Sequence, residues 1–176
     1  MCIEVEIKAW VDDFDKTLQL LKDNYKFVKQ YHKEDIYLEG IDSFSEARKE
    51  VRLRKDGDSY IVTYKDRSHE DKVEVNIEKE FNIDHKDNFL YVMNQLGFKE
   101  YIRKEKKGYL FNSNNINLEL SHVNGLGDFI EIEKIITNRC LIDSTKEDLY
   151  NILKVIDINK SKIEDRYYVQ MLKEGK

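Results

Sequence analysis

Charged and apolar residues alternate along several strand-like runs, and this alternation constrains the fold more than any other feature of the sequence. The first run is Glu4-Val5-Glu6-Ile7-Lys8. Successive side chains on a strand point to opposite faces, so two carboxylates and one ammonium group share a face there. The pattern returns at 49–55, 59–65, 72–81, 100–106 and 128–137. One such face is typical of a half-exposed strand, and five or six require a further explanation.

Two arrangements accommodate these strands. In the first, the charged faces of an open sheet or sandwich point at water. In the second, the sheet closes into an antiparallel barrel whose apolar outside is covered by amphipathic helices and whose lumen carries the charges. Buried charges must be paired, solvated or bound to metal, so such a lumen would hold a ligand. Arginines and lysines suit a polyphosphate, and carboxylates suit Mg²⁺ or Mn²⁺. Such a lumen would hold Lys8, Arg52, Arg54, Lys65, Lys104 and Lys106 beside Glu4, Glu6, Glu78, Glu80, Glu131 and Glu133.

The remaining pattern predicts an α+β protein in one domain, 1–176. The first run belongs to a strand expected at 2–11, and further strands are expected at 30–39, 108–112 and 115–122. Helices are expected at 13–27 and 84–96, where apolar residues recur at helical spacing. Ser144-Thr145-Lys146-Glu147 and Ser161-Lys162-Ile163-Glu164 match capping boxes, which predict two C-terminal helices.

Composition excludes several classes of function. The net charge is −5 with both signs interleaved, which argues against a nucleic-acid partner. No apolar run approaches the roughly 20 residues of a membrane span, and no signal peptide is recognisable, so we expect no membrane partner and a cytoplasmic location. Cys2 and Cys140 are expected to be free thiols.

Several motifs occur together in one order along the chain. They are E-x-E-x-K at 4–8, KEDIYLE at 33–39, VRLRK at 51–55, VTYK at 62–65, IEKEF at 77–81, LGFKEYIRKEKKGYLF at 96–111, NGLGDFIEIE at 124–133 and DRYYVQML at 165–172. In this set the chain resembles the CYTH proteins, the triphosphate tunnel metalloenzymes. That family includes class IV adenylate cyclases, thiamine triphosphatases and inorganic triphosphatases. The G-L-G-x-F-x-E-I-E stretch resembles the cyclase and thiamine-triphosphatase-like branch most closely.

The resemblance implies roles for individual residues. It implies a Mg²⁺ or Mn²⁺ cofactor held by Glu4, Glu6, Glu131 and Glu133, and a triphosphate-containing small molecule as substrate. Catalytic roles fall to Lys8, Glu6 and Glu131. The expected triphosphate-binding residues are Arg52, Arg54, Lys65, Lys104, Lys106 and Arg166, with Lys106 standing where the family usually has arginine. Members of this branch are often dimers, so a homodimer is a further expectation.

One position departs from the family pattern. The family usually has L-D-x-V before the G-L-G loop, whereas this chain has Leu120-Ser121-His122-Val123. Glu119 lies two residues earlier on the same strand face and is a candidate substitute. A serine in place of the aspartate puts the activity or the substrate preference in question.

Three functions remain open from the sequence. An adenylate cyclase would form cyclic AMP and pyrophosphate from ATP, and the G-L-G and D-I-Y stretches favour it. A triphosphatase would hydrolyse thiamine triphosphate, tripolyphosphate or a nucleoside triphosphate with the same lumen and metal. A non-catalytic module that binds polyphosphate or nucleotides is the third, and Ser121 is consistent with it.

Overall fold

The computed structural model describes residues 2–40 and 49–175. Its elements are nine strands, four α-helices and two short 3₁₀ helices. The strands are β1 (Ile3–Trp10), β2 (Lys26–Glu39), β3 (Lys49–Asp56), β4 (Ser59–Asp66), β5 (His69–Glu70), β6 (Val73–Ile83), β7 (Lys99–Ser113), β8 (Ile116–Val123) and β9 (Gly127–Ile136). The helices are α1 (Phe14–Asn24), α2 (Lys86–Gln95), α3 (Ile142–Val155) and α4 (Tyr168–Glu174), with η1 (Arg139–Leu141) and η2 (Lys160–Lys162).

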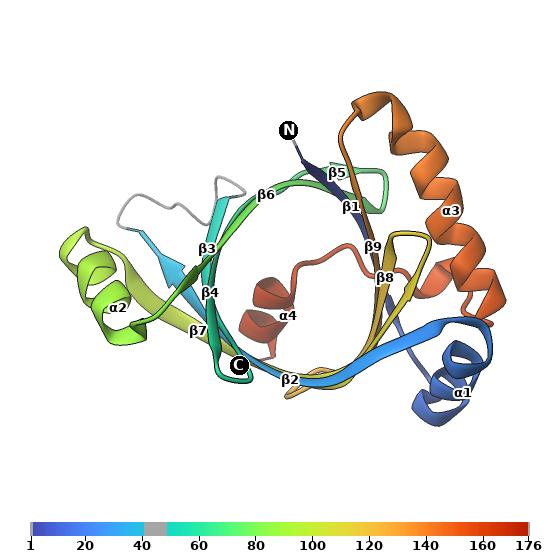
Figure 1. Ribbon diagram of the computed structural model, residues 1–176, viewed down its shortest axis with the longest axis horizontal. Coiled ribbons are helices and arrows are strands. Elements are labelled where there is room, and N and C mark those ends of the chain that lie inside the picture. Colours follow the sequence, from blue (N-terminus) through green and yellow to red (C-terminus); the bar gives the residue numbers. More distant parts are fainter. Residues whose placement is uncertain (1, 41–48, 176) are drawn as a thin grey trace.

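The sheet closes on itself, as the barrel interpretation predicts. Antiparallel neighbours follow the order β1-β9-β8-β7-β2-β3-β4-β6, and β6 pairs back onto β1. β5 adds a short edge to β6. Figure 1 shows the ring viewed along the barrel. A closed barrel has no free strand edge, so each wall strand has hydrogen-bonded neighbours on both sides.

The alternation decides which face of each strand points inward. On β1, Ile3, Val5 and Ile7 belong to the outer core, together with buried residues of α1 and α3 such as Leu21 and Leu149. Figure 1 shows α1 and α3 along one side of the ring. The hydrophobic effect therefore drives the apolar faces toward the helices and leaves the charged faces to the lumen.

One end of the lumen is filled by apolar side chains. α4 lies within the outline of the barrel in Figure 1. Its Tyr168 and Met171 pack in a buried cluster with Phe129, and Trp10 contacts that cluster. Trp10 and Phe129 are cross-strand neighbours on the inward faces of β1 and β9. The charged part of the lumen is therefore a pocket closed at this end.

Several predicted boundaries are wrong, and three of them concern β7 and the two C-terminal helices. The strands expected at 100–106 and 108–112 are one continuous strand, β7, which runs through Gly108. The glycine allows the neighbouring strand β8 to approach closely, since a Cβ at this position would lie 2.1 Å from the carbonyl oxygen of Leu120. Ser144 lies inside α3, where its hydroxyl donates to the carbonyl of Leu141. Ser161 lies in η2, and the last helix begins only at Tyr168.

Within residues 2–40 and 49–175, no helix has the length and apolarity needed to cross a membrane.

Candidate active site

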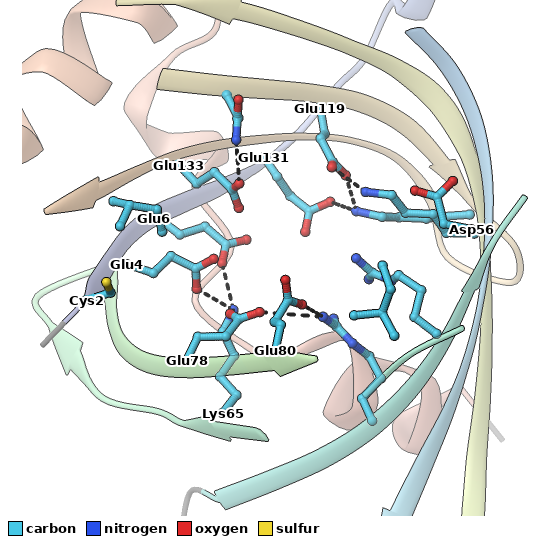
Figure 2. Close-up of a pocket in the computed structure, with 17 residues that line it drawn as sticks. Cys2, Glu4, Glu6, Asp56, Lys65, Glu78, Glu80, Glu119, Glu131 and Glu133 are labelled. Carbon is cyan, nitrogen blue, oxygen red and sulfur yellow. Dashed lines mark hydrogen bonds and ion pairs between the residues drawn. The ribbon is translucent and has the colours of Figure 1, made fainter. Parts of the chain in front are cut away.

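A cavity of about 490 Å³ occupies the charged part of the lumen. Figure 2 shows the side chains that point into it. They come from all eight strands of the barrel wall or, for Cys2, from just before β1. The lining residues are Cys2, Glu4, Glu6, Lys33, Arg52, Arg54, Asp56, Ile61, Lys65, Glu78, Glu80, Lys106, Asn117, Glu119, Glu131, Glu133 and Ile135. The list includes four predicted metal ligands and four of the six predicted triphosphate-binding residues.

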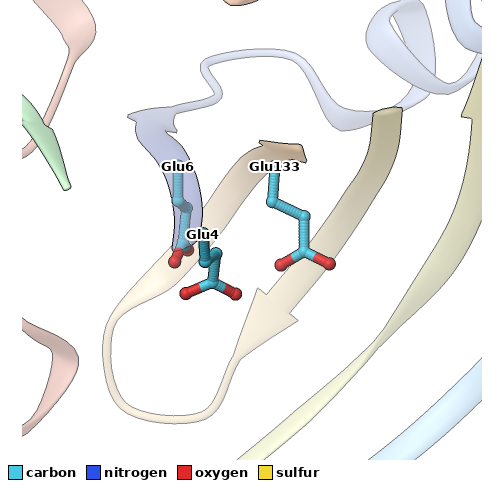
Figure 3. Close-up of side chains that lie close together, drawn as sticks. All are labelled: Glu4, Glu6 and Glu133. Carbon is cyan, nitrogen blue, oxygen red and sulfur yellow. The ribbon is translucent and has the colours of Figure 1, made fainter. Parts of the chain in front are cut away.

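Three carboxylates gather on one wall of the cavity. Glu4 and Glu6 are two residues apart on β1, and Glu133 is the cross-strand neighbour of Glu6 on β9. One carboxylate oxygen from each lies within 4.8 Å of the others (Figure 3). Hard oxygen donors at this spacing fit Mg²⁺ or Mn²⁺, since both ions prefer carboxylate ligands. Glu131 lies outside this trio.

Burial and mutual repulsion disturb the titration of this trio. Desolvation raises the pKa of Glu6 to about 7, and repulsion from Glu74, Glu131 and Glu133 adds to that rise although Lys65 opposes it. The pKa of Glu4 is also raised well above its ordinary value, for the same main reason. A divalent cation bound to these oxygens would favour the ionised form of both carboxyl groups.

Lys65 on β4 supplies the nearest positive charge to the trio. Its ammonium lies 2.6 Å from a Glu4 oxygen and 3.3 Å from oxygens of Glu6 and Glu78. The side chain is 8% exposed. Lys65 therefore belongs to the acidic wall in this structure and neutralises part of its charge.

Cations dominate the opposite wall. Arg52 and Arg54 project from β3, with Lys33 on β2 and Lys106 on β7. The Arg54 guanidinium donates two hydrogen bonds to Asp35, at 2.7 and 3.0 Å, which fixes the plane of its fork. An arginine held in this way presents a preset cation to phosphoryl oxygens.

Lys106 joins the cationic wall to the acidic one. Its ammonium lies 2.6 Å from Glu119 and 2.5 Å from Glu131. Burial alone would raise the pKa of Glu131, but the adjacent Lys106 lowers it to about 2. Glu131 is thus ionised and held by a lysine rather than by the acidic trio.

The remaining predicted residues lie outside the cavity lining. Lys8 is buried and donates to the backbone carbonyl of Arg166 at 2.6 Å. Lys104 pairs with Asp35 at 3.1 Å and lies over the Tyr168 ring. The Arg166 side chain is 47% exposed and pairs with Glu164 and Glu174.

Among the residues that sequence reasoning missed are Lys33, which lines the cavity, and Asp35, which pairs with Arg54 behind it. Both alternate with Glu34 and Ile36 on β2, and the register places Lys33 beside Lys106 and Asp35 beside Lys104. Parity along the KEDIYLE stretch was the signal that could have found them.

Ser121 occupies a closed position in the wall. It is fully buried, and its hydroxyl has no hydrogen-bond partner among the described residues. A Cβ added at Gly108 would lie 2.9 Å from the Cβ of Ser121, so β7 and β8 are closely packed at this point. Glu119, two residues earlier, carries the carboxylate that β8 presents to the cavity.

The cavity has an excess of negative charge. Eight carboxylates and five cations line it, which gives a formal charge of −3 when all are ionised. A polyanion would therefore enter more readily together with a divalent cation than alone.

Comparison with known proteins identifies the fold and the family. The CYTH domain profile matches residues 2–168. A Methanocaldococcus jannaschii protein named as a putative adenylate cyclase is 34% identical over 171 residues, which cover 96% of this chain and 98% of the relative. The PH1819 protein of Pyrococcus horikoshii superposes with a TM-score of 0.88 at 27% identity, covering 98% of this chain and 99% of its own.

A more distant structure shares the fold. It is a Hippeastrum protein described as a putative adenylyl cyclase with a dominant triphosphatase activity. Its TM-score is 0.74 at 16% identity, with 100% of this chain and 97% of the other covered. The closed barrel and the profile match over nearly the whole sequence agree, and the chain belongs to the CYTH domain family.

Proposed function

We propose that this protein is a divalent-metal-dependent triphosphatase that hydrolyses the terminal phosphoanhydride bond of a triphosphate. The observation that carries the proposal is the division of one cavity into a carboxylate wall and a cation wall. Thirteen of the seventeen lining residues carry an ionisable acid or base, so the chemistry of the lining matches phosphoryl oxygens and a metal ion. Members of this family act on triphosphate substrates.

The cationic wall would bind the phosphate chain. Two arginines of β3 would offer guanidinium forks to the phosphoryl oxygens. Arg54 is fixed by its hydrogen bonds to Asp35. The Arg52 guanidinium lies 3.6 Å from Glu80 and 3.8 Å from Glu78. Lys106 adds a point charge beside the two arginines. Positioning and charge neutralisation of this kind supply most of the catalysis of phosphoryl transfer.

The acidic wall would serve the metal and the attacking water. Glu4, Glu6 and Glu133 would hold the Mg²⁺ or Mn²⁺ ion, which supplies charge neutralisation at the phosphoryl oxygens. Glu131 is ionised between this trio and Lys106, so its carboxylate can accept a hydrogen bond from a water molecule and orient it toward the terminal phosphorus. The water oxygen then forms the new P–O bond and its proton is released to solvent, while the diphosphate product leaves with the electron pair of the cleaved P–O bond.

Cyclisation is the second candidate. The relative that is 34% identical is named as a putative adenylate cyclase, which favours it. In that reaction the ribose 3′-oxygen attacks the α-phosphorus of ATP, the hydroxyl proton is released, and pyrophosphate leaves. The same two walls would serve, with the chain of phosphates shifted so that the α-phosphorus faces the nucleophile.

The deciding experiment separates the products of purified protein incubated with ATP, thiamine triphosphate or tripolyphosphate and Mg²⁺ or Mn²⁺. Release of orthophosphate, abolished by EDTA, supports the triphosphatase. Cyclic AMP with pyrophosphate supports the cyclase instead. Binding of these triphosphates without turnover would refute both and leave a binding module.

Matched variants test the assignment of the walls. Lys106→Met should lower kcat/KM by about 10²-fold or more, as the loss of an electrostatic contact at the reacting group does. Lys107→Met is the control, because Lys107 is the next residue on β7 and its side chain is 64% exposed on the other face. Equal activity of the two variants would contradict the assignment.

A further inference from the structure

Glu119 is held in the lumen by a set of donors that would also suit a phosphoryl group. One carboxylate oxygen accepts a hydrogen bond from Lys33. The other accepts from the Tyr31 hydroxyl at 3.0 Å and from Lys106 at 2.6 Å. The three donors come from the neighbouring strands β2 and β7, and Glu119 comes from β8.

The two lysine donors are balanced by two carboxylates, because Lys106 pairs with Glu131 as well as with Glu119. Burial, and then repulsion from Lys106 and Arg54, lowers the pKa of Lys33 to about 8, although Glu119 opposes that shift. The side chains of Lys33 and Lys106 are only 8% and 3% exposed. Water therefore screens these ammonium groups weakly, and an anion between them is strongly favoured.

Asp35 provides the comparison, because it also holds two cations. It is 1% exposed, pairs with Arg54 and Lys104, and does not line the cavity. Glu119 lies in the cavity lining, and Figure 2 shows dashed lines from its carboxylate to neighbouring side chains, among them the hydrogen bonds from Lys33 and Lys106. A ligand entering the cavity meets Glu119 directly, whereas Asp35 is out of its reach.

We propose that Tyr31, Lys33 and Lys106 form a phosphoryl subsite that Glu119 occupies as an internal counter-ion, and that an incoming polyphosphate competes with Glu119 for it. This inference rests on the proposed function, since it assumes that the cavity takes a phosphate chain. A phosphoryl group carries more charge and more acceptor oxygens than a carboxylate, so it gains more from two ammonium groups and a phenol. Glu119 thereby lowers the affinity for short anions that fill only this subsite.

Competition between Glu119 and the ligand determines whether a substitution raises or lowers the affinity for tripolyphosphate. Glu119→Gln keeps the shape of the side chain and removes the competing charge, so tripolyphosphate should bind more tightly by about tenfold. Lys33→Met should bind it more weakly by about the same factor. If Glu119 instead serves to position the lysines for substrate, Glu119→Gln binds more weakly, and that result overturns the inference.

Isothermal titration calorimetry with tripolyphosphate, and separately with orthophosphate, measures these affinities on the full chain. EDTA keeps the samples metal-free, so that no turnover occurs during the titration. Glu105→Gln is the matched control, because the Glu105 side chain on β7 is 38% exposed and pairs with His32 and Lys107 outside the lumen. Its affinity should equal that of the wild type.

The possible failures are distinguishable. If wild-type protein binds no tripolyphosphate with or without Mg²⁺, the proposed function fails. If the wild type binds it and Glu119→Gln binds no tighter, only the subsite inference fails. Should Glu119→Gln not fold, Lys33→Met decides, and unchanged affinity in that variant overturns the inference.

Discussion

Lys65→Met tests how the acidic wall is held together without metal. The substitution removes the ammonium group that lies 2.6 Å from Glu4 and 3.3 Å from Glu6 and Glu78. It also changes the formal charge of the lining from −3 to −4. Loss of one partner from a buried ion pair costs about 3–5 kcal/mol. For a chain of this length that corresponds to a fall in Tm of about 6–20 °C.

The loss of stability in Lys65→Met should grow as pH rises, because the pKa values of Glu4 and Glu6 are raised in the folded protein. A carboxyl group whose pKa is raised on folding stabilises the folded state at low pH, and that contribution is lost as pH rises through the window from 4.5 to about 7 for Glu6. Lys65 limits this rise, so its removal extends the window upward. At pH 5.5 Glu6 is protonated in both proteins, and the substitution removes mainly the pairing of Lys65 with Glu78, whose pKa is lowered to about 2. The difference should therefore be smaller than the full value. At pH 8.5 it should be close to the full value.

Thermal unfolding followed by circular dichroism at the two pH values, in EDTA, measures this difference. Lys55→Met is the control, since Lys55 is 48% exposed and its only ion pair among the described residues is a 3.7 Å contact with Glu34. Mg²⁺ or Mn²⁺ should then restore more stability to Lys65→Met than to the wild type, because the ion replaces the lost charge. An equal loss of Tm at both pH values would refute the reasoning, because it would mean that the ionised carboxylates do not depend on Lys65.

Three further predictions follow from single positions. Gly108→Ala should destabilise the fold by about 2–3 kcal/mol, because its Cβ would lie 2.1 Å from the carbonyl oxygen of Leu120; an unchanged Tm would contradict this close approach. Arg166→Ala should leave the KM for tripolyphosphate unchanged, because the Arg166 guanidinium pairs with Glu164 and Glu174 outside the cavity lining. A raised KM would instead indicate that Arg166 contacts the substrate. Ser121→Asp should lower the free energy of unfolding by about 3–5 kcal/mol, because it buries an unpaired charge. Ser121→Ala should be neutral when both variants are measured by denaturant titration. Equal stability of the two variants would contradict the burial of this position.

Local patterns predicted most of the wall and part of the helices. The helix expected at 13–27 ends at Asn24, because residues from Lys26 onward pair with β7, as in the contact of Phe27 with Phe111. Helical spacing alone carried no information about that partner strand. The C-terminal capping box at Ser161 failed for a similar reason: Glu164 accepts from the indole of Trp10 and its backbone donates to Lys8, so tertiary contacts hold this segment extended.

The sequence by itself determined which residues share a face. Side-chain alternation is a property of the extended backbone, so Glu4 and Glu6, and likewise Arg52 and Arg54, had to project together wherever their strands lay. Their resemblance to a known set of motifs then predicted a closed barrel, and strand pairing confirms it.

The tertiary structure decided which charges meet. Strand register brings Glu133 to Glu6 and leaves Glu131 to Lys106, and it places Asp35 behind Arg54. Register and barrel stagger depend on long-range pairing between strands that lie far apart in the chain, and no local pattern encodes the distance between two such side chains. The partners of each buried charge, and therefore its pKa and its availability to a ligand, come only from the closed fold.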